Sequence, residues 1–154
     1  MIYLAIGSNL ASSYGNRLTN INLAISYLKE NKIKIVKKSS FYETLSYPDK
    51  TKPKFINIVI AVKSNLSARD LMSTLLSIEE KLERKRLKKN DPRTCDIDII
   101  DFKGMIIKDK NLTTPHPQCH TRNFVLYPLK EICPNWIHPI FNKKIDILIK
   151  KLNI

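Results

Sequence analysis

Alternating apolar and polar residues predict four main strands. Residues two positions apart on a strand project from the same face, so an apolar side chain at every second position indicates one buried face. This pattern predicts strands at Ile2–Ser8, Ile33–Thr44, Phe55–Lys63 and Cys95–Phe102, and a short return strand at Met105–Lys108 after a turn at Lys103–Gly104. In the third strand the even-numbered residues are apolar and share one face, whereas Phe55 and Asn57 share the other.

Apolar residues three and four positions apart predict the helices. They predict helices at Tyr14–Glu30, directly after Ser67, at Phe124–Ile132 and at Ile145–Leu152. Ser67 and Asp70 resemble a capping box, whose side chains bond the free backbone N–H groups of a first helical turn. The polar span Glu43–Lys54, with two prolines, and the very basic span Arg84–Thr94 are predicted loops.

The order of these elements predicts the fold class. Strand, helix, two strands, helix and strand is the βαββαβ order of a ferredoxin-like α+β sandwich. One antiparallel sheet then carries two helices on one face, and the other face is left to long loops, the C-terminal tail and any ligand. The chain of 154 residues suits a single domain, residues 1–154, without repeats or linkers.

The formal net charge of +13 has two interpretations. One is a polyanionic partner such as nucleic acid, and the other is a drift of composition toward lysine, isoleucine and asparagine. The arginines are more informative, because there are only six, and Arg84, Arg86, Arg93 and Arg122 lie in the basic loop or after it. The planar guanidinium binds phosphate in a bidentate fashion, whereas lysine offers a point charge.

The cysteines and the N-terminus favour a cytoplasmic protein. Cys95, Cys119 and Cys133 form no CxxC pair, which fits free thiols in a reducing compartment. The apolar run at the N-terminus lacks a basic leader and is too short for a signal peptide. No run approaches the length of a bilayer span, so no membrane partner is expected.

The stretch DPRTCDIDIIDF, residues 91–102, puts two carboxylates into a predicted buried strand. Asp96 and Asp98 lie two positions apart, so they point to the same side, while the isoleucines that alternate with them point into the core. Ile100 and Asp101 break the alternation, which indicates a bulge or the end of the strand.

The carboxylate pair predicts a cation site. Two like charges side by side repel each other unless a cation or a proton lies between them. Mg²⁺ is the natural cation, since it takes hard oxygen ligands and is usually held by one or two carboxylates together with phosphates. The alternative is an exposed sheet face that merely carries acids. Arg93 and the basic loop before the pair favour a metal-bound polyphosphate.

Two familiar nucleotide-binding loops are missing from the sequence. It contains neither GxxxxGK[ST] nor GxGxxG, and it has only three glycines. Any nucleotide is therefore expected to be held by side chains and metal.

Five stretches together make the chain resemble one family. They are AIGSNL (5–10), SSFYET (39–44), FINIVIAV (55–62), DPRTCDIDII (91–100) and TPHPQCHTRNFVLYPL (114–129). In this order they resemble 6-hydroxymethyl-7,8-dihydropterin pyrophosphokinase, and the resemblance extends from Ile2 to about Pro139. It implies an enzyme of folate biosynthesis that moves the diphosphate of ATP onto the hydroxymethyl oxygen of a reduced pterin and releases AMP.

The resemblance also implies roles for the charged residues. Asp96 and Asp98 would ligate two Mg²⁺ ions that bridge ATP and the pterin. The implied catalytic residues are Arg84, Arg86 and Arg93, the first two of which match a mobile loop that closes over ATP. The residues implied to contact the phosphates of ATP are Arg84, Arg93, His116 and Arg122.

For the pterin, the resemblance implies an aromatic slot with a polar edge. Phe55 and Phe124 would stack on the two faces of the ring, and Asn57 would hydrogen-bond its amide edge. The remaining contacts would come from Thr44, Leu45 and Tyr47. The strand pattern agrees, because Phe55 and Asn57 share a face and can act on one ligand. The implied partners are these two small molecules alone, bound by a monomer.

Two stretches depart from the family pattern. Asn90 and Asp91 stand where many members carry Trp-Gly before the Pro-Arg, and the basic loop is about one residue shorter. Leu45-Ser46-Tyr47 replaces a proline-rich stretch before Pro48. The first departure bears on how the loop closes, and the second on how rigid the pterin-facing backbone is.

Two alternatives compete with the enzyme. A basic ferredoxin-like sheet is also the outline of an RNA-binding module, although the aromatic pattern of such modules is missing and two aspartates would repel the RNA backbone. A zinc site at His116, Cys119 and His120 lacks a fourth ligand at a suitable spacing. Glu79 and Glu80 are expected to be solvated helix acids, one of them paired with Arg84.

Overall fold

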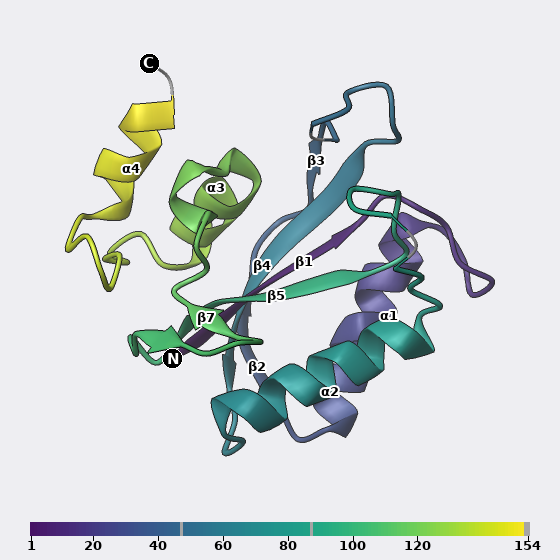
Figure 1. Cartoon of the computed structure of the whole chain (residues 1–154), viewed down its shortest axis with the longest axis horizontal. Coiled ribbons are helices and arrows are strands. Elements are labelled where there is room, and N and C mark those ends of the chain that lie inside the picture. The colour runs from purple at the N-terminus through teal and green to yellow at the C-terminus, as the bar shows by residue number, and fades with distance from the viewer. Residues whose placement is uncertain (47, 87, 153–154) are drawn as a thin grey trace.

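The computed structural model describes residues 1–46, 48–86 and 88–152 and contains a five-stranded antiparallel sheet. The strand order is β2–β4–β1–β5, and β3 pairs with β4 further along the edge that β2 occupies (Figure 1). The strands are β1 (Ile2–Ser8), β2 (Lys34–Lys38), β3 (Tyr42–Thr44), β4 (Phe55–Lys63) and β5 (Asp96–Phe102). The predicted α+β class with an antiparallel sheet is confirmed.

The predicted strand Ile33–Thr44 is two strands, because the chain leaves the ladder between Lys38 and Tyr42. The Ser39 backbone N–H donates to the Val59 carbonyl at 3.0 Å, and the Ser39 hydroxyl accepts from the Val59 N–H at 3.0 Å. A serine side chain thus replaces one backbone partner, which ends β2 and lets β3 start again on the same edge.

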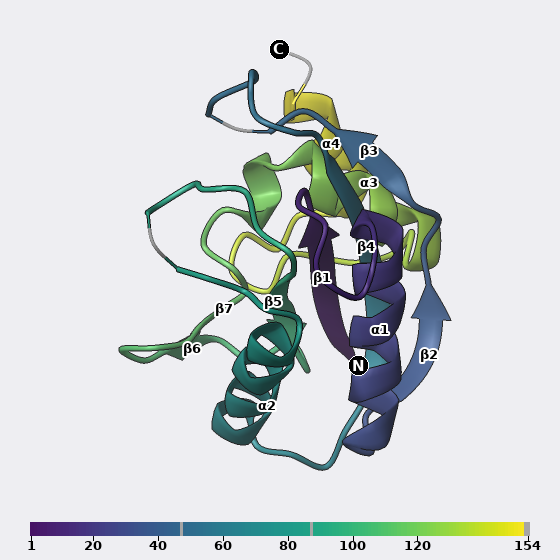
Figure 2. The ribbon, with the colours of Figure 1, turned by 90° about the vertical axis from the view of Figure 1, so that its right-hand side faces the viewer.

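Two pairs of helices lie on opposite faces of the sheet (Figures 1 and 2). Helices α1 (Arg17–Glu30) and α2 (Ala68–Lys81) cover one face; the turn η1 (Cys119–Thr121), α3 (Asn123–Ile132) and α4 (Ile145–Leu152) lie over part of the other. Helix α1 begins three residues later than predicted, since the Asn16 carboxamide accepts the Thr19 N–H at 3.0 Å and caps it. The predicted Ser67 cap of α2 is present, accepting the Asp70 N–H at 3.1 Å.

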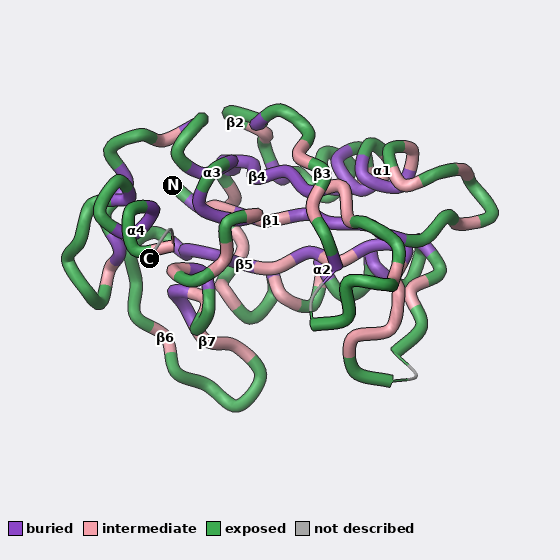
Figure 3. Tube along the Cα trace, turned by 90° about the horizontal axis from the view of Figure 1, so that it is seen from above, coloured by how far each residue is buried: buried purple, intermediate pink, exposed green. Residues whose placement is uncertain are grey.

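The sheet separates two apolar cores, and β5 contributes to both. Figure 3 shows buried residues concentrated along β4, β1 and β5. Ile99 packs in the core under α1 and α2, whereas Ile100 packs in the core under α3 and α4. The pairing with β1 slips here, because Leu4 pairs with Ile99 but Tyr3 pairs with Asp101. Of the two outcomes that the broken alternation predicts, a bulge or the end of the strand, the structure has the bulge, and β5 continues to Phe102.

The segment after β5 forms a small sheet of its own. The turn at Gly104 is present, but the predicted return strand is only β6 (Ile107–Lys108), and it pairs with β7 (Thr113–Thr114) instead of β5. A single bridge from Met105 to Phe102 is what remains of the expected pairing. Every helix in the described part of the chain is too short or too polar to cross a bilayer.

Helices α3 and α4 cover the later part of β4 and leave its first residues uncovered. Val59 and Ala61 are buried beneath these helices, whereas Phe55 is only partly buried. This end of the sheet is where β1 ends, where β4 and β5 begin, and where the loops before β4 and β5 meet (Figure 2). The predicted free face is thus confined to one end of the sheet.

Candidate active site

Three neighbouring strands bring the predicted pterin and metal residues into one row. Gly7 of β1 pairs with Asn57 of β4 on one side and with Asp96 of β5 on the other. In the next row Ala5 lies between Val59 and Asp98. Asn57, Asp96 and Asp98 therefore share the sheet face opposite α1 and α2, since residues two apart on a strand point the same way.

Gly7 keeps this row open. A Cβ atom at Gly7 would lie 2.7 Å from the Asn57 Oδ1 and 3.5 Å from the Phe55 ring. Any larger residue would therefore displace the amide and crowd the aromatic ring. The sequence contains Gly7 within one of the quoted motifs, but its role follows only from the strand pairing.

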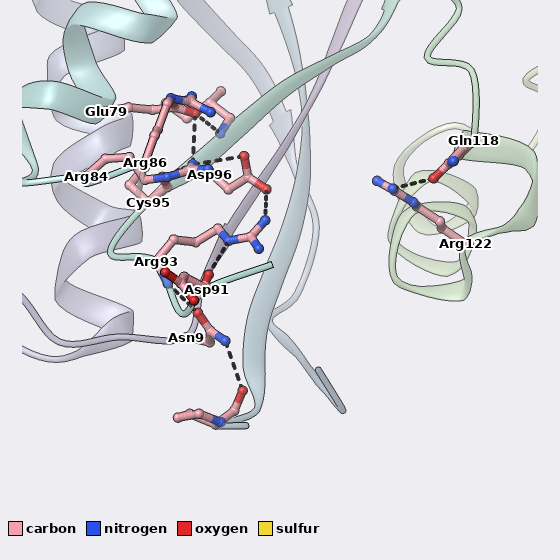
Figure 4. A network of polar contacts seen from close by, with 12 residues as sticks. Asn9, Glu79, Arg84, Arg86, Asp91, Arg93, Cys95, Asp96, Gln118 and Arg122 are labelled. Atoms are coloured by element: carbon pink, nitrogen blue, oxygen red, sulfur yellow. Dashed lines mark hydrogen bonds and ion pairs between the residues drawn. The ribbon is translucent and has the colours of Figure 1, made fainter. Parts of the chain in front are cut away.

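Asp96 is held by two arginines (Figure 4). The Arg84 guanidinium lies 3.2 Å from Asp96 Oδ1, and the Arg93 guanidinium lies 3.3 Å from Oδ2. Arg84 also donates to the Cys95 carbonyl at 2.8 Å, so it is fixed at the start of β5. The structure thus brings both arginines to Asp96, the first carboxylate of the pair.

Asp98 lies in a less favourable environment than Asp96. Burial, followed by the negative charges of Asp96 and Glu79, raises the pKa of Asp98 to about 8, against the weaker opposing effect of Arg122 and Arg84. A carboxylate beside another carboxylate is stabilised by a proton or a cation between them. The site fits Mg²⁺ in its chemistry, because it offers two carboxylates as hard oxygen ligands and a bound cation would stabilise the charged form of Asp98.

Glu79 is a site residue that the sequence interpretation missed. The side chain is 3% exposed, and its carboxylate accepts the Ile97 N–H at 2.7 Å, between the two aspartates. It also bonds Arg86 and lies 3.7 Å from Arg84. The expectation of a solvated acid is wrong for Glu79, which follows Leu75 by one helical turn and so shares the buried face of α2. Burial raises its pKa.

Asn9 is the other polar residue that the interpretation missed. It follows β1 directly, is 2% exposed, and accepts the Arg93 N–H on its Oδ1 at 2.7 Å. Its backbone N–H donates to the Arg93 carbonyl at 3.0 Å. The last residues of the basic loop are therefore anchored on the end of β1. Polar residues that follow a strand are common, and nothing in the sequence distinguishes this one.

The predicted pterin residues line one side of this row. Asn57 donates from Nδ2 to the Thr44 hydroxyl at 2.8 Å, which leaves its Oδ1 toward Gly7. Thr44 pairs with Phe55 across β3 and β4, and Leu45 is exposed just beyond. Tyr47, predicted to take part, lies outside the described residues.

Each predicted stacking ring lies under an arginine. The Arg93 guanidinium lies 5.4 Å from the centre of the Phe55 ring, and the Arg122 guanidinium lies 5.5 Å from that of Phe124. Arg93 thereby faces both an aromatic ring and Asp96. Cation–π contacts of this kind hold an arginine at the border between an aromatic slot and a charged site.

His116 is a neutral side chain at the edge of the site. Its backbone N–H donates to the Ile100 carbonyl at 2.9 Å, and its Nδ1 accepts the Gln118 N–H at 3.1 Å, which puts the ring proton on Nε2. Burial, followed by the charge of Arg122, lowers the pKa of His116 to about 4, against the opposing effect of Asp96. The Arg122 guanidinium donates to the Gln118 Oε1 at 2.6 Å, which orients the arginine.

The described residues hold no complete metal site made of protein side chains alone. Within residues 1–46, 48–86 and 88–152, no three or more histidines, cysteines and acids are grouped so that they could hold a metal ion. Zinc at His116, Cys119 and His120 therefore lacks support, and Mg²⁺ at Asp96 and Asp98 would need phosphate oxygens as further ligands. Cys95 and Cys119 are buried, and burial raises the pKa of both thiols, that of Cys119 to about 12. Buried, protonated thiols of this kind are inert.

Comparison with known proteins gives consistent results. Residues 3–134 match the model of the family described as 7,8-dihydro-6-hydroxymethylpterin-pyrophosphokinase (HPPK). A 2-amino-4-hydroxy-6-hydroxymethyldihydropteridine pyrophosphokinase of Aquifex aeolicus is 38% identical over 92% of this chain and 86% of its own length. A protein of the same name from Synechocystis is 37% identical over 94% of this chain and 74% of its own length.

Some relatives are much longer. The chain matches only 20% of a folic acid synthesis protein of Dictyostelium discoideum, with 37% identity over 90% of this chain. The crystal structure of wild-type HPPK-DHPS from Plasmodium falciparum superposes with a TM-score of 0.74 and 17% identity; the match covers 97% of this chain and 44% of that one. At this identity the likeness shows the fold alone.

Proposed function

The chain belongs to the 7,8-dihydro-6-hydroxymethylpterin-pyrophosphokinase family, and from that premise we propose that it transfers the β,γ-diphosphate of ATP to 6-hydroxymethyl-7,8-dihydropterin, a step of folate biosynthesis. The observation that carries the proposal is the row Asn57–Gly7–Asp96, which sets a ring-binding amide beside an arginine-held carboxylate. An RNA-binding module gains no support, because this face of the sheet presents two carboxylates.

The reaction needs positioning and charge neutralisation more than a protein nucleophile. The hydroxymethyl oxygen attacks the β-phosphorus, the bond from that phosphorus to the α,β-bridging oxygen breaks, and AMP leaves with the bridging oxygen. The hydroxyl proton is released as the new O–P bond forms. The hydroxymethyl oxygen, the β-phosphorus and the bridging oxygen must therefore lie on one line. We propose that the pterin binds at the Asn57 end of the row and ATP at the Asp96 end.

Asp96 and Asp98 are proposed to hold two Mg²⁺ ions that accompany ATP. When bound, the metal neutralises the charge that develops on the phosphate oxygens. Arg84 and Arg93 already lie beside Asp96, and their guanidinium groups offer phosphate a bidentate partner. Arg86 is mostly exposed and adds to them from the basic loop.

His116 and Arg122 are proposed to complete the ATP site. His116 is neutral, so it presents an N–H donor on Nε2 to a phosphate oxygen without requiring a proton from solution. Arg122 lies above Phe124, and its guanidinium is proposed to turn toward a phosphate oxygen when ATP binds.

The pterin is proposed to lie between Phe55 and Phe124, which requires Arg93 and Arg122 to move off the rings as phosphate binds. The Asn57 Oδ1 would accept an N–H of the ring edge, since its Nδ2 is already bonded to Thr44. Thr44, Leu45 and Tyr47 would complete the edge. The protein is proposed to act on these two substrates as a cytoplasmic monomer, without a nucleic-acid or membrane partner.

Product analysis tests the function. Purified protein with ATP, Mg²⁺ and the hydroxymethyl pterin should give AMP and the pterin diphosphate, identified by mass spectrometry. Asp96→Ala should lower the rate by about a hundredfold or more, because it removes charge compensation where the phosphates react. Asp109→Ala is the control, since the exposed Asp109 carboxylate lies outside the row; it is 3.7 Å from the exposed Arg69 and accepts the Lys110 N–H at 2.6 Å. Release of ADP in place of AMP would contradict the proposal.

A further inference from the structure

Asn9 joins two loops that are far apart in the sequence. Its Nδ2 donates to the Pro53 carbonyl at 3.1 Å, across 44 positions, and its Oδ1 accepts the Arg93 N–H at 2.7 Å, across 84 positions (Figure 4). The side chain is 2% exposed, so both hydrogen bonds are shielded from water. A single buried amide therefore holds one loop with its donor and the other with its acceptor.

The two loops serve different substrates in the proposed function. Pro53 lies two residues before Phe55, which is proposed to stack on the pterin. Arg93 lies three residues before Asp96 and pairs with it, on the side proposed for ATP. A shift of either loop would therefore strain the amide that holds the other.

Further contacts connect the same two loops. The Lys52 ammonium donates to the Asn90 carbonyl at 3.0 Å and lies 3.9 Å from the Asp91 carboxylate. The Arg93 guanidinium lies over the Phe55 ring. Asn9 thus forms the buried centre of a connection whose outer part is formed by Lys52.

We propose that Asn9 is a positioning residue that couples the loop before β4, which is proposed to bind the pterin, to the loop before β5, which is proposed to bind ATP, so that occupation of one site changes the affinity of the other. The coupling rests on the proposed function, because it concerns those two substrates. It is reciprocal, since the factor by which one ligand changes the affinity of the other must hold in both directions. A residue with a merely structural role would stabilise the fold without changing that factor.

Two substitutions of Asn9 separate its bonds. Asn9→Asp keeps an oxygen acceptor for the Arg93 N–H but turns a second oxygen toward the Pro53 carbonyl, so it removes only the bond to the pterin loop. Asn9→Ser is too short to reach either partner and removes both. Neither substitution alters a group that is proposed to contact substrate.

Asn20→Asp is the matched control. Asn20 is also fully buried, donates from Nδ2 to the Leu10 carbonyl at 3.0 Å, and accepts from the Ser12 hydroxyl at 2.6 Å. The Nδ2 also donates to the Ser8 hydroxyl at 3.5 Å, so all three partners lie at the end of β1 or in the segment between β1 and α1. The same chemical change at Asn20 should lower the thermal midpoint without touching the connection between the loops.

The measurement is the dissociation constant of 6-hydroxymethyl-7,8-dihydropterin, with and without the Mg²⁺ complex of α,β-methylene ATP, which cannot release AMP. The ratio of the two constants should be about fivefold or more in the wild type. It should fall below about twofold in Asn9→Asp and Asn9→Ser and stay at the wild-type value in Asn20→Asp. An unchanged ratio in a folded Asn9 variant, or an equal loss in Asn20→Asp, would overturn the coupling role.

Lys52→Ala keeps the test decisive if the Asn9 variants do not fold. Lys52 is half-buried, and its loss should lower the ratio about twofold, whereas Lys50→Ala at an exposed position of the same loop should not change it. An unchanged ratio in Lys52→Ala would then overturn the proposal. A wild type that forms AMP but shows a ratio of one overturns the coupling alone, while a wild type that binds neither substrate overturns the proposed function.

Discussion

At the scale of single residues, Asp98 lies where a carboxylate is costly without a ligand. Its neighbour Asp96 has two arginines within 3.3 Å, whereas Asp98 faces negative charge from Asp96 and Glu79. Functional sites keep such groups because the ligand, and not the protein, supplies the compensating charge. The two aspartates of one motif thus have different environments, which the motif alone does not reveal.

Asp98→Asn should stabilise the ligand-free protein, and more so at high pH. With a folded pKa of about 8, raised from 3.8, the folded state binds more protons than the unfolded state between these values. The free energy of unfolding of the wild type therefore falls as pH rises from about 4 to about 8 and stays low above that range. Asp98→Asn has no carboxyl group at this position and does not show this loss. Chemical denaturation in EDTA should give a larger stability gain for the variant at pH 9 than at pH 5.

The control for this prediction is Asp109→Asn, a surface substitution that should give the same small difference at both values of pH. A gain for Asp98→Asn that does not change with pH would mean that packing, and not charge, accounts for it. The same variant should lose most of its activity, so stability and function change in opposite directions at this position.

At the scale of elements, the strands and helices with strong periodicity follow from the sequence. The strands β1 and β4, the helix α4 and the bulge in β5 lie where apolar spacing predicts them. The break after β2 does not, because it depends on the Ser39 hydroxyl meeting a backbone group of β4, a partner that only the folded sheet provides. The start of α1 depends in the same way on a local cap at Asn16.

The same limit applies to the candidate site. Asp96, Asp98 and Asn57 share a face because strand alternation requires it, so the sequence suffices for that grouping. Glu79 and Asn9 enter the site through contacts between elements, namely α2 with β5 and the end of β1 with two loops. Contacts of that kind have no signature in the spacing of residues along one element.

Glu79→Gln should destabilise the protein and loosen both arginines of the basic loop. The substitution keeps an acceptor for the Ile97 N–H but removes the charge that faces Arg84 and Arg86. A buried charged hydrogen bond that loses one partner costs about 1–3 kcal/mol. Urea denaturation should show this loss, and turnover should fall as the arginines lose their position.

Glu80→Gln on the exposed face of α2 is the matched control. It makes the same chemical change one residue away and should stay within about 0.5 kcal/mol of the wild type. If the two variants prove equally stable, the buried ion pairs of Glu79 contribute nothing net to folding.

At the scale of the whole molecule, the proposed site occupies one end of the sheet, and the rest of the same face is covered by helices. Helices α3 and α4 bury Ile100, Val59 and Ala61 beneath them and stop short of Phe55. The carboxylate of Asp101, 5% exposed, accepts the Trp136 indole N–H at 2.8 Å and the Gly104 N–H at 2.9 Å. Asp101 thus has a structural role, although it lies only three residues after Asp98, which is proposed to bind the metal.

Trp136→Phe should lower stability without changing substrate affinity. It leaves an oxygen of Asp101 buried without its donor, at a cost of about 1–3 kcal/mol. Denaturation followed by circular dichroism measures the loss, since the variant removes the only tryptophan. The Michaelis constants for ATP and pterin should match those of the wild type at 20 °C or below. A selective rise in either constant would mean that packing in the core under α3 and α4 affects substrate binding.

The slipped register in β5 limits how this chain can diverge among descendants. Ile99 pairs with Leu4 and Asp101 pairs with Tyr3, so Ile100 is the extra residue of the bulge. Loss of Ile100 would remove the bulge and leave Asp101 and Phe102 in their present layers, whereas loss of a residue from the regular stretch before Ile99 would turn the side chains on one side of the gap toward the opposite layer. Among descendants, β5 should therefore tolerate shortening by one residue at the bulge and not within the stretch that carries the two aspartates.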